Sequence, residues 1–410
     1  MNKTEKNPGL KSFDKTQTKI LLVCFVIYFC AYIGRLNLSA TLEDIMAAFP
    51  AINDAQAGLI QTVFAITYAA GQLTFGLLSD KLRPRSMLLT GLIGSALCNL
   101  MFSFMRSYYL LLLFWTLNGA FQAMLWTPIV ICMAHTFRPE QRKSASFVMS
   151  FTLAAGHFAA WGLAIGVSRA LSWRWSYRLP TLILLMAAAL AYFNLPKGLR
   201  SVAKRGGESG SAPIRALLGT GIVFMLLCCV ANGFVRDGVI TWAPTIIGAD
   251  SKLFSLIIPC INLFGILLGS FLVRKARINI RALTGIMMLC VGVFALILTV
   301  WPDANVIALA LLLGFISALL YGTNPLLTTL VPMQYDALGR VGLVAGLNDS
   351  AIYVGSALAG SLTGLIRQQS GSWQGVYLAW LIVPVCGCVL AVISGRMQKK
   401  IAERRNKIAQ

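Results

Sequence analysis

The segment Tyr28–Asn37 reads YFCAYIGRLN and lies within the first long apolar run of the chain. It places Arg35 at what should be membrane depth. A second arginine, Arg236, occupies the comparable place in Ala231–Gly238, ANGFVRDG, in the first apolar run of the second half. An arginine at the bilayer centre costs roughly 2.5–3.5 kcal/mol on insertion scales, so such residues are usually paired or functional. The two arginines therefore predict a cavity that holds an anion.

The composition around these arginines is that of a membrane protein. Of the 410 residues, 57% are hydrophobic and 12% are charged, whereas soluble domains contain about 25% charged residues. Apolar runs of about 18 residues or more, the length that crosses a bilayer as a helix, recur along the whole chain. The first run is too long for a signal peptide, and no small-residue cleavage site follows it. The sequence therefore predicts an all-α, multi-pass membrane protein.

The apolar runs divide into two sets of six. We predict membrane-spanning helices over residues 19–41, 55–79, 86–104, 108–134, 144–168, 177–196, 214–247, 253–273, 281–300, 304–332, 340–366 and 373–394. The predicted domains are an N-terminal tail, a six-helix bundle, a linker, a second six-helix bundle and a C-terminal tail, over residues 1–18, 19–196, 197–213, 214–394 and 395–410. A duplicated half related by a pseudo-two-fold axis places a substrate site at the midplane, between the bundles.

The net charge of +21, from 35 basic and 14 acidic residues, has an explanation in membrane topology. Most of the basic residues lie in the two tails and in alternate loops, and few lie in the loops between them. The positive-inside rule assigns the basic loops to the cytoplasm. We therefore expect both termini to be cytoplasmic, in a multi-pass protein of the bacterial inner membrane, and we expect no binding to nucleic acid.

The cysteines and histidines do not have the spacing of a metal or cofactor site. All ten cysteines fall inside apolar runs, where a thiol behaves as a small buried apolar group. The two histidines form no zinc-ligand spacing with a cysteine. The sequence contains no phosphate-binding loop of the form GxxxxGKS or GxxxxGKT, and no catalytic triad. We therefore predict no metal and no cofactor, and these patterns argue against an enzyme and against primary active transport.

The loop after the second predicted helix carries a known kind of signature. Residues 76–85 read GLLSDKLRPR. This segment resembles the GxxxDRxGRR signature of the major facilitator superfamily. The resemblance implies a cytoplasmic gate motif made by Gly76, Asp80, Lys81 and Arg85. In that motif Gly76 allows close helix approach, and Asp80 latches the two bundles by pairing with basic groups.

Longer segments resemble one branch of that superfamily, the organophosphate:phosphate antiporters. Residues 118–142 read NGAFQAMLWTPIVICMAHTFRPEQR and are similar to the fourth span and the following loop of that branch. The segments around Arg35, Arg236 and Tyr353 resemble its first-, seventh- and eleventh-span motifs. The resemblance implies exchange of a phosphorylated metabolite for inorganic phosphate, with the two arginines binding the phosphate group.

The chemistry of arginine agrees with that role. A guanidinium stays charged at any depth, and its fork of donors fits a tetrahedral oxyanion. Two guanidiniums from opposite bundles can hold one dianion, and rocking of the bundles about it alternates the access. We expect Arg236 to pair poorly with Asp237, because adjacent residues of a helix point apart.

Three positions depart from the pattern of the resembled branch. Leu36 and Gln72 stand where it tends to have lysines, and His157 lies one helical turn later than its histidine. The loss of two cations favours a less highly charged ligand, or one whose sugar portion is recognised differently. Besides the two arginines, the residues that we expect to bind substrate are Tyr32, Gln72, Gln122, Trp126, His157, Tyr321, Asn324, Asn348 and Tyr353.

Asp349, within LNDSAIYVG of the eleventh predicted helix, leaves two alternatives open. A carboxylate inside the membrane is costly unless it is paired, protonated or wetted. It could pair with an arginine in the empty site and take a proton when the ligand arrives, which would mean proton symport. Alternatively, it lies at a helix end near the cytoplasm and is structural.

We interpret the chain as a secondary active transporter of a small organic anion by alternating access, in exchange for phosphate. The favoured substrate class is a phosphorylated sugar, polyol or acid. One alternative is a proton-coupled symporter of a carboxylate or sulfonate that uses Asp349, and another is a transporter-like membrane sensor of an external phosphate ester. The expected partners are the organic anion, phosphate or a proton as the coupling ion, and the lipid bilayer. The expected oligomeric state is a monomer.

Overall fold

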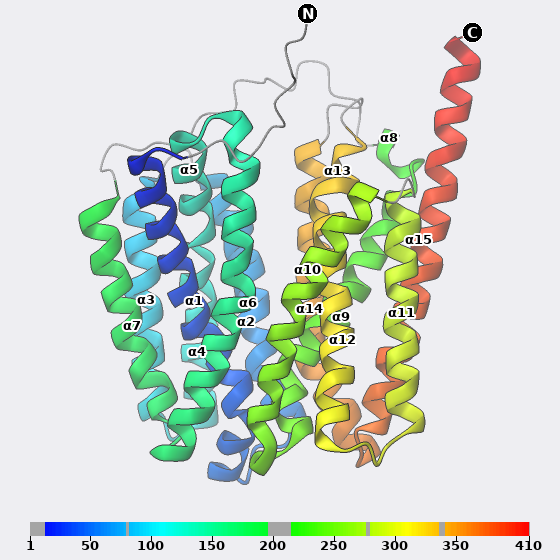
Figure 1. Ribbon diagram of the computed structural model, residues 1–410. Helices are drawn as coiled ribbons and strands as arrows, with labels where there is room; N and C mark the ends of the chain where they lie inside the picture. Colours follow the sequence, from blue (N-terminus) through cyan, green and yellow to red (C-terminus); the bar gives the residue numbers. More distant parts are fainter. Residues whose placement is uncertain (1–12, 79–81, 196–214, 276–278, 336–340, 410) are drawn as a thin grey trace, which may run out of the picture.

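The computed structural model describes residues 13–78, 82–195, 215–275, 279–335 and 341–409, which contain helices and no strands (Figure 1). The helices are α1 (Lys15–Ala48), α2 (Asp54–Leu78), α3 (Pro84–Phe104), α4 (Tyr108–Ala123), α5 (Trp126–Thr136), α6 (Pro139–Ala170), α7 (Trp175–Asn194), α8 (Arg215–Leu218), α9 (Ile222–Ile247), η1 (Ala249–Leu256), α10 (Ile257–Lys275), α11 (Ile280–Val300), α12 (Val306–Pro325), η2 (Leu326–Leu330), α13 (Val331–Met333), α14 (Val341–Ser370) and α15 (Gln374–Ala409).

The predicted architecture of two six-helix bundles is confirmed. Ten helical segments within the described residues are long and apolar enough to cross a membrane. The other two long helices are α2 and α14, which pack against each other between the bundles and exchange polar contacts there. Four predicted spans are each divided into two or more pieces: α4 with α5, α8 with α9, η1 with α10, and α12 with η2 and α13.

Figure 1 shows the two bundles side by side, with α1 to α7 in the first half and α8 to α15 in the second. We call the end of the molecule where α1 begins and α15 ends the terminal end. The opposite end, where α1 ends at Ala48 and α2 begins at Asp54, is the distal end.

The halves meet most closely where α2 crosses α14 near the distal end. A Cβ atom added at Gly58 would overlap the carbonyl oxygen of Gly360, and one added at Gly364 would overlap that of Asp54. Close by, the Thr62 hydroxyl donates to the carbonyl of Ala357 at 2.6 Å. Glycine at these positions lets the two backbones touch, as small residues commonly do at helix crossings in membranes.

Two features of the second half go beyond what the sequence predicts. Arg281, a basic residue at the start of the predicted span 281–300, is fully buried at the start of α11. Its Nη1 donates to the carbonyl of Ser394 at 2.8 Å and its Nη2 to the hydroxyl of Tyr335 at 2.7 Å, so it joins α11 to α15 and to the end of α13. In addition, α15 continues as a helix to Ala409, through the predicted C-terminal tail.

Candidate functional site

A cavity of about 230 Å³ lies between the two halves. The first half contributes residues of α1, α2 and α6, and the second half contributes residues of α9, α12 and α14. The side chains that the site uses below are Tyr28, Tyr32, Arg35, Leu36, Tyr68, Arg236, Asp237, Tyr321, Asn324, Asp349, Tyr353 and Ser356. No group of three His, Cys, Asp or Glu side chains within the described residues could hold a metal ion.

Arg35 faces this cavity from α1 and lies among three tyrosine rings. Its Cζ is 4.0 Å from the ring centre of Tyr32, 5.5 Å from that of Tyr68 and 5.8 Å from that of Tyr28. Its Nη1 donates to the Tyr68 hydroxyl at 3.3 Å. No carboxylate pairs with it in the part of the chain that the structure describes. The electron-rich ring faces stabilise the cation, and most of its donors remain available to a ligand.

A buried polar network behind Arg35 fixes the position of α1. The amides of Asn99 and Asn118 both donate to the carbonyl of Gly34, at 2.9 and 3.0 Å. Gln122 donates to the carbonyl of Ala31 at 3.2 Å and to the hydroxyl of Ser95 at 2.9 Å. Polar groups buried in a membrane domain must find partners inside the protein. The network therefore holds α1 against α3 and α4 at the depth of the cavity.

Arg236 faces the same cavity from α9 but is already paired. Its Nε and Nη2 donate to the two carboxylate oxygens of Asp237 at 2.8 and 3.0 Å, and its Nη1 donates to Asn324 at 2.8 Å. The Ser356 hydroxyl of α14 donates to the same Asp237 carboxylate. The expectation of a poor pair between Arg236 and Asp237 was therefore wrong, because the long arginine side chain can fold back to reach its neighbour.

Asp349 and Tyr353 lie one helical turn apart on α14 and line the cavity. The Tyr353 ring meets the Tyr68 ring of α2 at a centroid distance of 5.2 Å, which joins the halves across the cavity wall. The Asp349 side chain is exposed to the cavity and makes no hydrogen bond or ion pair within the described residues. Of the two alternatives for Asp349, its position therefore favours a role in the cavity.

Six of the predicted site residues besides Asp349 meet at this cavity, namely Arg35, Arg236, Tyr32, Tyr321, Asn324 and Tyr353. The other five have packing or positioning contacts next to it. Gln72 donates to the Tyr68 hydroxyl at 2.8 Å, and the Trp126 ring packs on Tyr28 at 4.8 Å. His157 is buried edge-on against Trp161 at 4.3 Å. Gln122 belongs to the network behind Arg35, and Asn348 donates to the carbonyl of Leu327 at 2.7 Å. A direct contact of these five with a ligand stays a prediction.

Sequence reasoning missed Tyr68 and Ser356. Tyr68 accepts hydrogen bonds from both Arg35 and Gln72, so its own hydroxyl proton remains to be donated to a ligand. A signal was present, because Tyr68 and Gln72 are four residues apart and share a helical face. Ser356 lies three residues after Tyr353 on α14, but only the structure shows that it holds Asp237.

The gate motif is only partly described. Asp80 and Lys81 lie outside the described residues, and Gly76 lies within α2. Arg85, on α3, donates to the carbonyl of Tyr192 on α7, and its Cζ lies 4.5 Å from the Tyr192 ring centre. Arg85 therefore contacts its own half.

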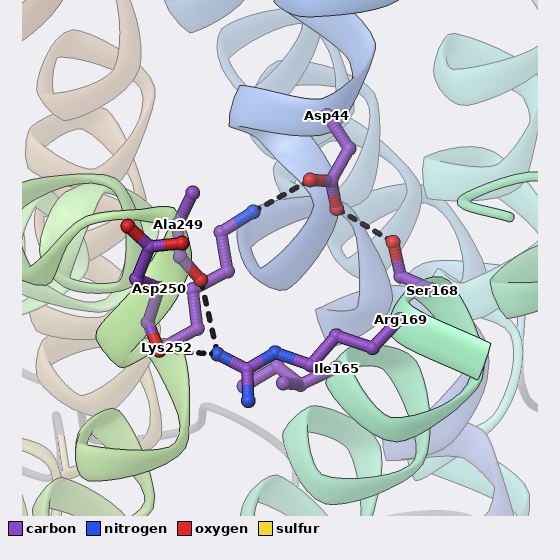
Figure 2. Close-up of a pocket in the computed structure, with 7 residues that line it drawn as sticks. All are labelled: Asp44, Ile165, Ser168, Arg169, Ala249, Asp250 and Lys252. Carbon is purple, nitrogen blue, oxygen red and sulfur yellow. Dashed lines mark hydrogen bonds and ion pairs between the residues drawn. The ribbon is translucent and has the colours of Figure 1, made fainter.

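A cluster at the distal end connects the halves by charge, and we call it the distal latch (Figure 2). Its members are Glu43, Asp44, Ser168, Arg169, Ala249, Asp250 and Lys252. Lys252 of η1 lies 2.8 Å from the carboxylate of Asp44 and 3.3 Å from that of Glu43, both on α1. Arg169 of α6 donates to the carbonyls of Ala249 and Asp250 at 3.1 and 2.6 Å. The latch therefore covers the distal side of the interface.

The chain is similar to several known proteins. The sequence profile of the Major Facilitator Superfamily matches residues 24–341. A glycerol-3-phosphate transporter of Bacillus subtilis is 23% identical, and the alignment covers 93% of this chain and 92% of that protein. A probable hexose phosphate transport protein of Chlamydia muridarum is 29% identical over 32% of this chain and 29% of its own length. The crystal structure of a bacterial homolog of the human lysosomal transporter Spinster, inward-facing and occupied, superposes with a TM-score of 0.71 and 16% identity, covering 96% of this chain and 98% of that one.

Proposed function

Because the chain belongs to the Major Facilitator Superfamily, and is therefore a membrane transporter, we propose that it exchanges a small phosphorylated organic anion for inorganic phosphate. The observation that carries the proposal is the meeting of Arg35 and Arg236, from opposite halves, at one cavity. The names of the relatives support the substrate class, since two of them are transporters of glycerol 3-phosphate or hexose phosphate.

The phosphate group binds first to Arg35, because this arginine has free donors and no carboxylate partner. A phosphate monoester carries a charge of about −1.5 to −2 at pH 7 and offers three strong acceptor oxygens. The guanidinium fork matches that geometry with two parallel hydrogen bonds. The Tyr68 hydroxyl can donate a further hydrogen bond from beside Arg35. Arg236 approaches from the second half, where Asp237 and Asn324 hold it in place.

Transport follows from rocking the halves about the bound anion. The α2–α14 crossing and the distal latch close the distal side of the cavity, so the ligand enters and leaves this conformation at the terminal end. With both termini in the cytoplasm of a bacterial cell, as the positive-inside rule assigns them, this conformation faces inward. The chain works as a monomer, because each copy contains both halves of the cavity.

Opening of the distal side must break the distal latch, and this gives a prediction. Changing Lys252 to methionine should raise the ratio of molecules with an open distal side to those with a closed one about 5- to 30-fold. This corresponds to a change of about 1–2 kcal/mol in the free-energy difference between the two conformations. Lys252 is 4% exposed, but its partners Glu43 and Asp44 are 31% and 28% exposed, so solvent reduces the effect below that of a fully buried pair. Distances between spin labels at Ala51 and Gln369, exposed positions at the distal end, would measure this population.

The control for that measurement is Lys19→Met, which removes an exposed lysine near the start of α1. It should leave the distance distribution unchanged. If Lys252→Met also leaves it unchanged, the latch does not stabilise the closed distal side.

Exchange itself is tested with purified protein in liposomes. Vesicles loaded with unlabelled phosphate should take up radiolabelled phosphate without a proton gradient, and external glycerol 3-phosphate should compete. Absence of phosphate uptake under all conditions would contradict the proposal.

The unpaired Asp349 carboxylate in the cavity supports a second candidate function, proton symport of an organic anion. Uptake that requires the gradient and ignores internal phosphate would favour that candidate.

A further inference from the structure

The charged groups at the cavity do not form a purely cationic site. Among the described lining residues, the two arginines are balanced by two aspartates, Asp237 and Asp349. Leu36 also lines the cavity and adds no charge. A dianion placed in such surroundings would gain from Arg35 but would be repelled by any carboxylate left unpaired. The distribution of paired and unpaired charges therefore decides which ligand is complementary.

Two of the four charged groups, Arg236 and Asp237, already neutralise each other as an ion pair. Asp237 receives two hydrogen bonds from Arg236 and one from Ser356, and a third N–H group of Arg236 donates to Asn324. Buried ion pairs are favourable when the geometry is bidentate and the other atoms are also hydrogen-bonded. This pair therefore presents little net charge to a ligand.

The other two charges face the cavity without a partner, one from each half. Arg35 has no carboxylate partner, and Asp349 has no cationic partner, within the described residues. Tyrosine rings line the same cavity: Arg35 contacts the Tyr68 ring, and the Tyr68 ring contacts that of Tyr353, one turn from Asp349. A carboxylate that faces a ligand cavity without a partner attracts a ligand cation, and tyrosine faces also attract ammonium groups.

We propose that the preferred substrate is a zwitterion, an aminoalkyl phosphate whose phosphate binds Arg35 and whose ammonium group binds Asp349. This inference rests on the proposed function, because it assumes a phosphorylated substrate at Arg35. Arg35 and Asp349 line one cavity, so the carbon chain between phosphate and ammonium must fit within it. The cavity of about 230 Å³ is below the usual range of about 300–1,000 Å³ for ligand pockets, which also favours a small ligand.

The charge of such a substrate suits exchange for phosphate. The phosphate monoester contributes about −1.5 to −2 at pH 7, and the ammonium group contributes a positive charge. The net charge is therefore close to that of the monobasic phosphate ion. Exchange of the two across the membrane then moves little net charge.

The test compares 2-aminoethyl phosphate with propyl phosphate, which has the same chain length and lacks the ammonium charge. Binding to the purified full-length protein is measured by displacement of radiolabelled phosphate. The wild-type protein should bind 2-aminoethyl phosphate about tenfold more tightly or better, as expected for a desolvated charge pair. Asp349→Asn should remove this preference, chiefly because propyl phosphate then binds more tightly once the repelling carboxylate is neutral, while 2-aminoethyl phosphate loses the partner of its ammonium group. Asp303→Asn, in the exposed loop after α11, is the matched control and should keep the preference.

The outcomes separate this inference from the proposed function. Equal binding of the two compounds by the wild-type protein would overturn the zwitterion while leaving phosphate binding at Arg35 intact. A preference that survives in Asp349→Asn would overturn it as well. If Asp349→Asn instead abolishes gradient-driven uptake of both compounds equally, Asp349 carries protons and the inference fails. If neither compound displaces phosphate, or phosphate does not bind, the proposed function itself fails.

Discussion

Replacing Arg35 by alanine is expected to weaken phosphate binding by about 2–5 kcal/mol, the usual cost of truncating one member of a desolvated charge pair. This corresponds to a roughly 30- to 5,000-fold rise in the dissociation constant, and transport should fall below detection. The reason is local, because Arg35 is the cavity arginine whose donors are not taken by a carboxylate. Radiolabelled phosphate binding and phosphate exchange in liposomes would measure the two effects.

Two further variants make the Arg35 result specific. Arg35→Lys keeps the charge but loses the donor fork and the planar packing on Tyr32, so it should recover only a small part of the binding. Arg106→Ala removes an exposed arginine outside the cavity and should bind phosphate normally. Near-normal phosphate binding by Arg35→Ala would remove the basis for a phosphorylated substrate at this cavity.

The positions of the membrane-spanning helices could be predicted because they depend on the hydropathy of consecutive residues, which the sequence gives directly. Long apolar runs can satisfy their backbone groups in lipid only as helices, so the spans of residues 86–104 and 281–300 agree closely with α3 and α11. The burial of Arg281 could not be predicted in this way. A basic residue at the end of an apolar run is usually solvated, and nothing in its neighbours shows that Ser394 and Tyr335, distant in the chain, enclose it.

The site was predictable where a residue's chemistry is incompatible with lipid. Arg35 and Arg236 stand out for that reason, and both face the cavity. Gln122 is also a polar residue inside an apolar run, but a buried amide can hold helices together as well as bind a ligand. Which of the two it does depends on the rotation of α4, and here it points toward Ser95 and the backbone of α1. Helix rotation is set by packing between helices, which a single sequence does not contain.

The α2–α14 crossing gives the second large effect, through Gly360→Leu. A side chain at this position would overlap the backbone of Gly58. Overpacking typically costs about 1–3 kcal/mol, which would shift the population toward an open distal side by roughly 5- to 150-fold. Exchange should therefore be nearly abolished, because the distal side can no longer close. Spin labels at Ala51 and Gln369 should report a longer distance.

Phosphate binding separates this effect from simple unfolding, because Arg35 and Arg236 lie on α1 and α9 and not on the two helices that cross. Gly360→Leu should therefore still bind phosphate, and so should remain folded, while failing to exchange it. Gly346→Leu is the matched control on the same helix, since a Cβ atom added there meets no atom within 4 Å, and it should exchange phosphate normally. If Gly360→Leu exchanges as fast as the wild-type protein, backbone contact at this crossing is not needed for closure, and the distal latch must close that side without it.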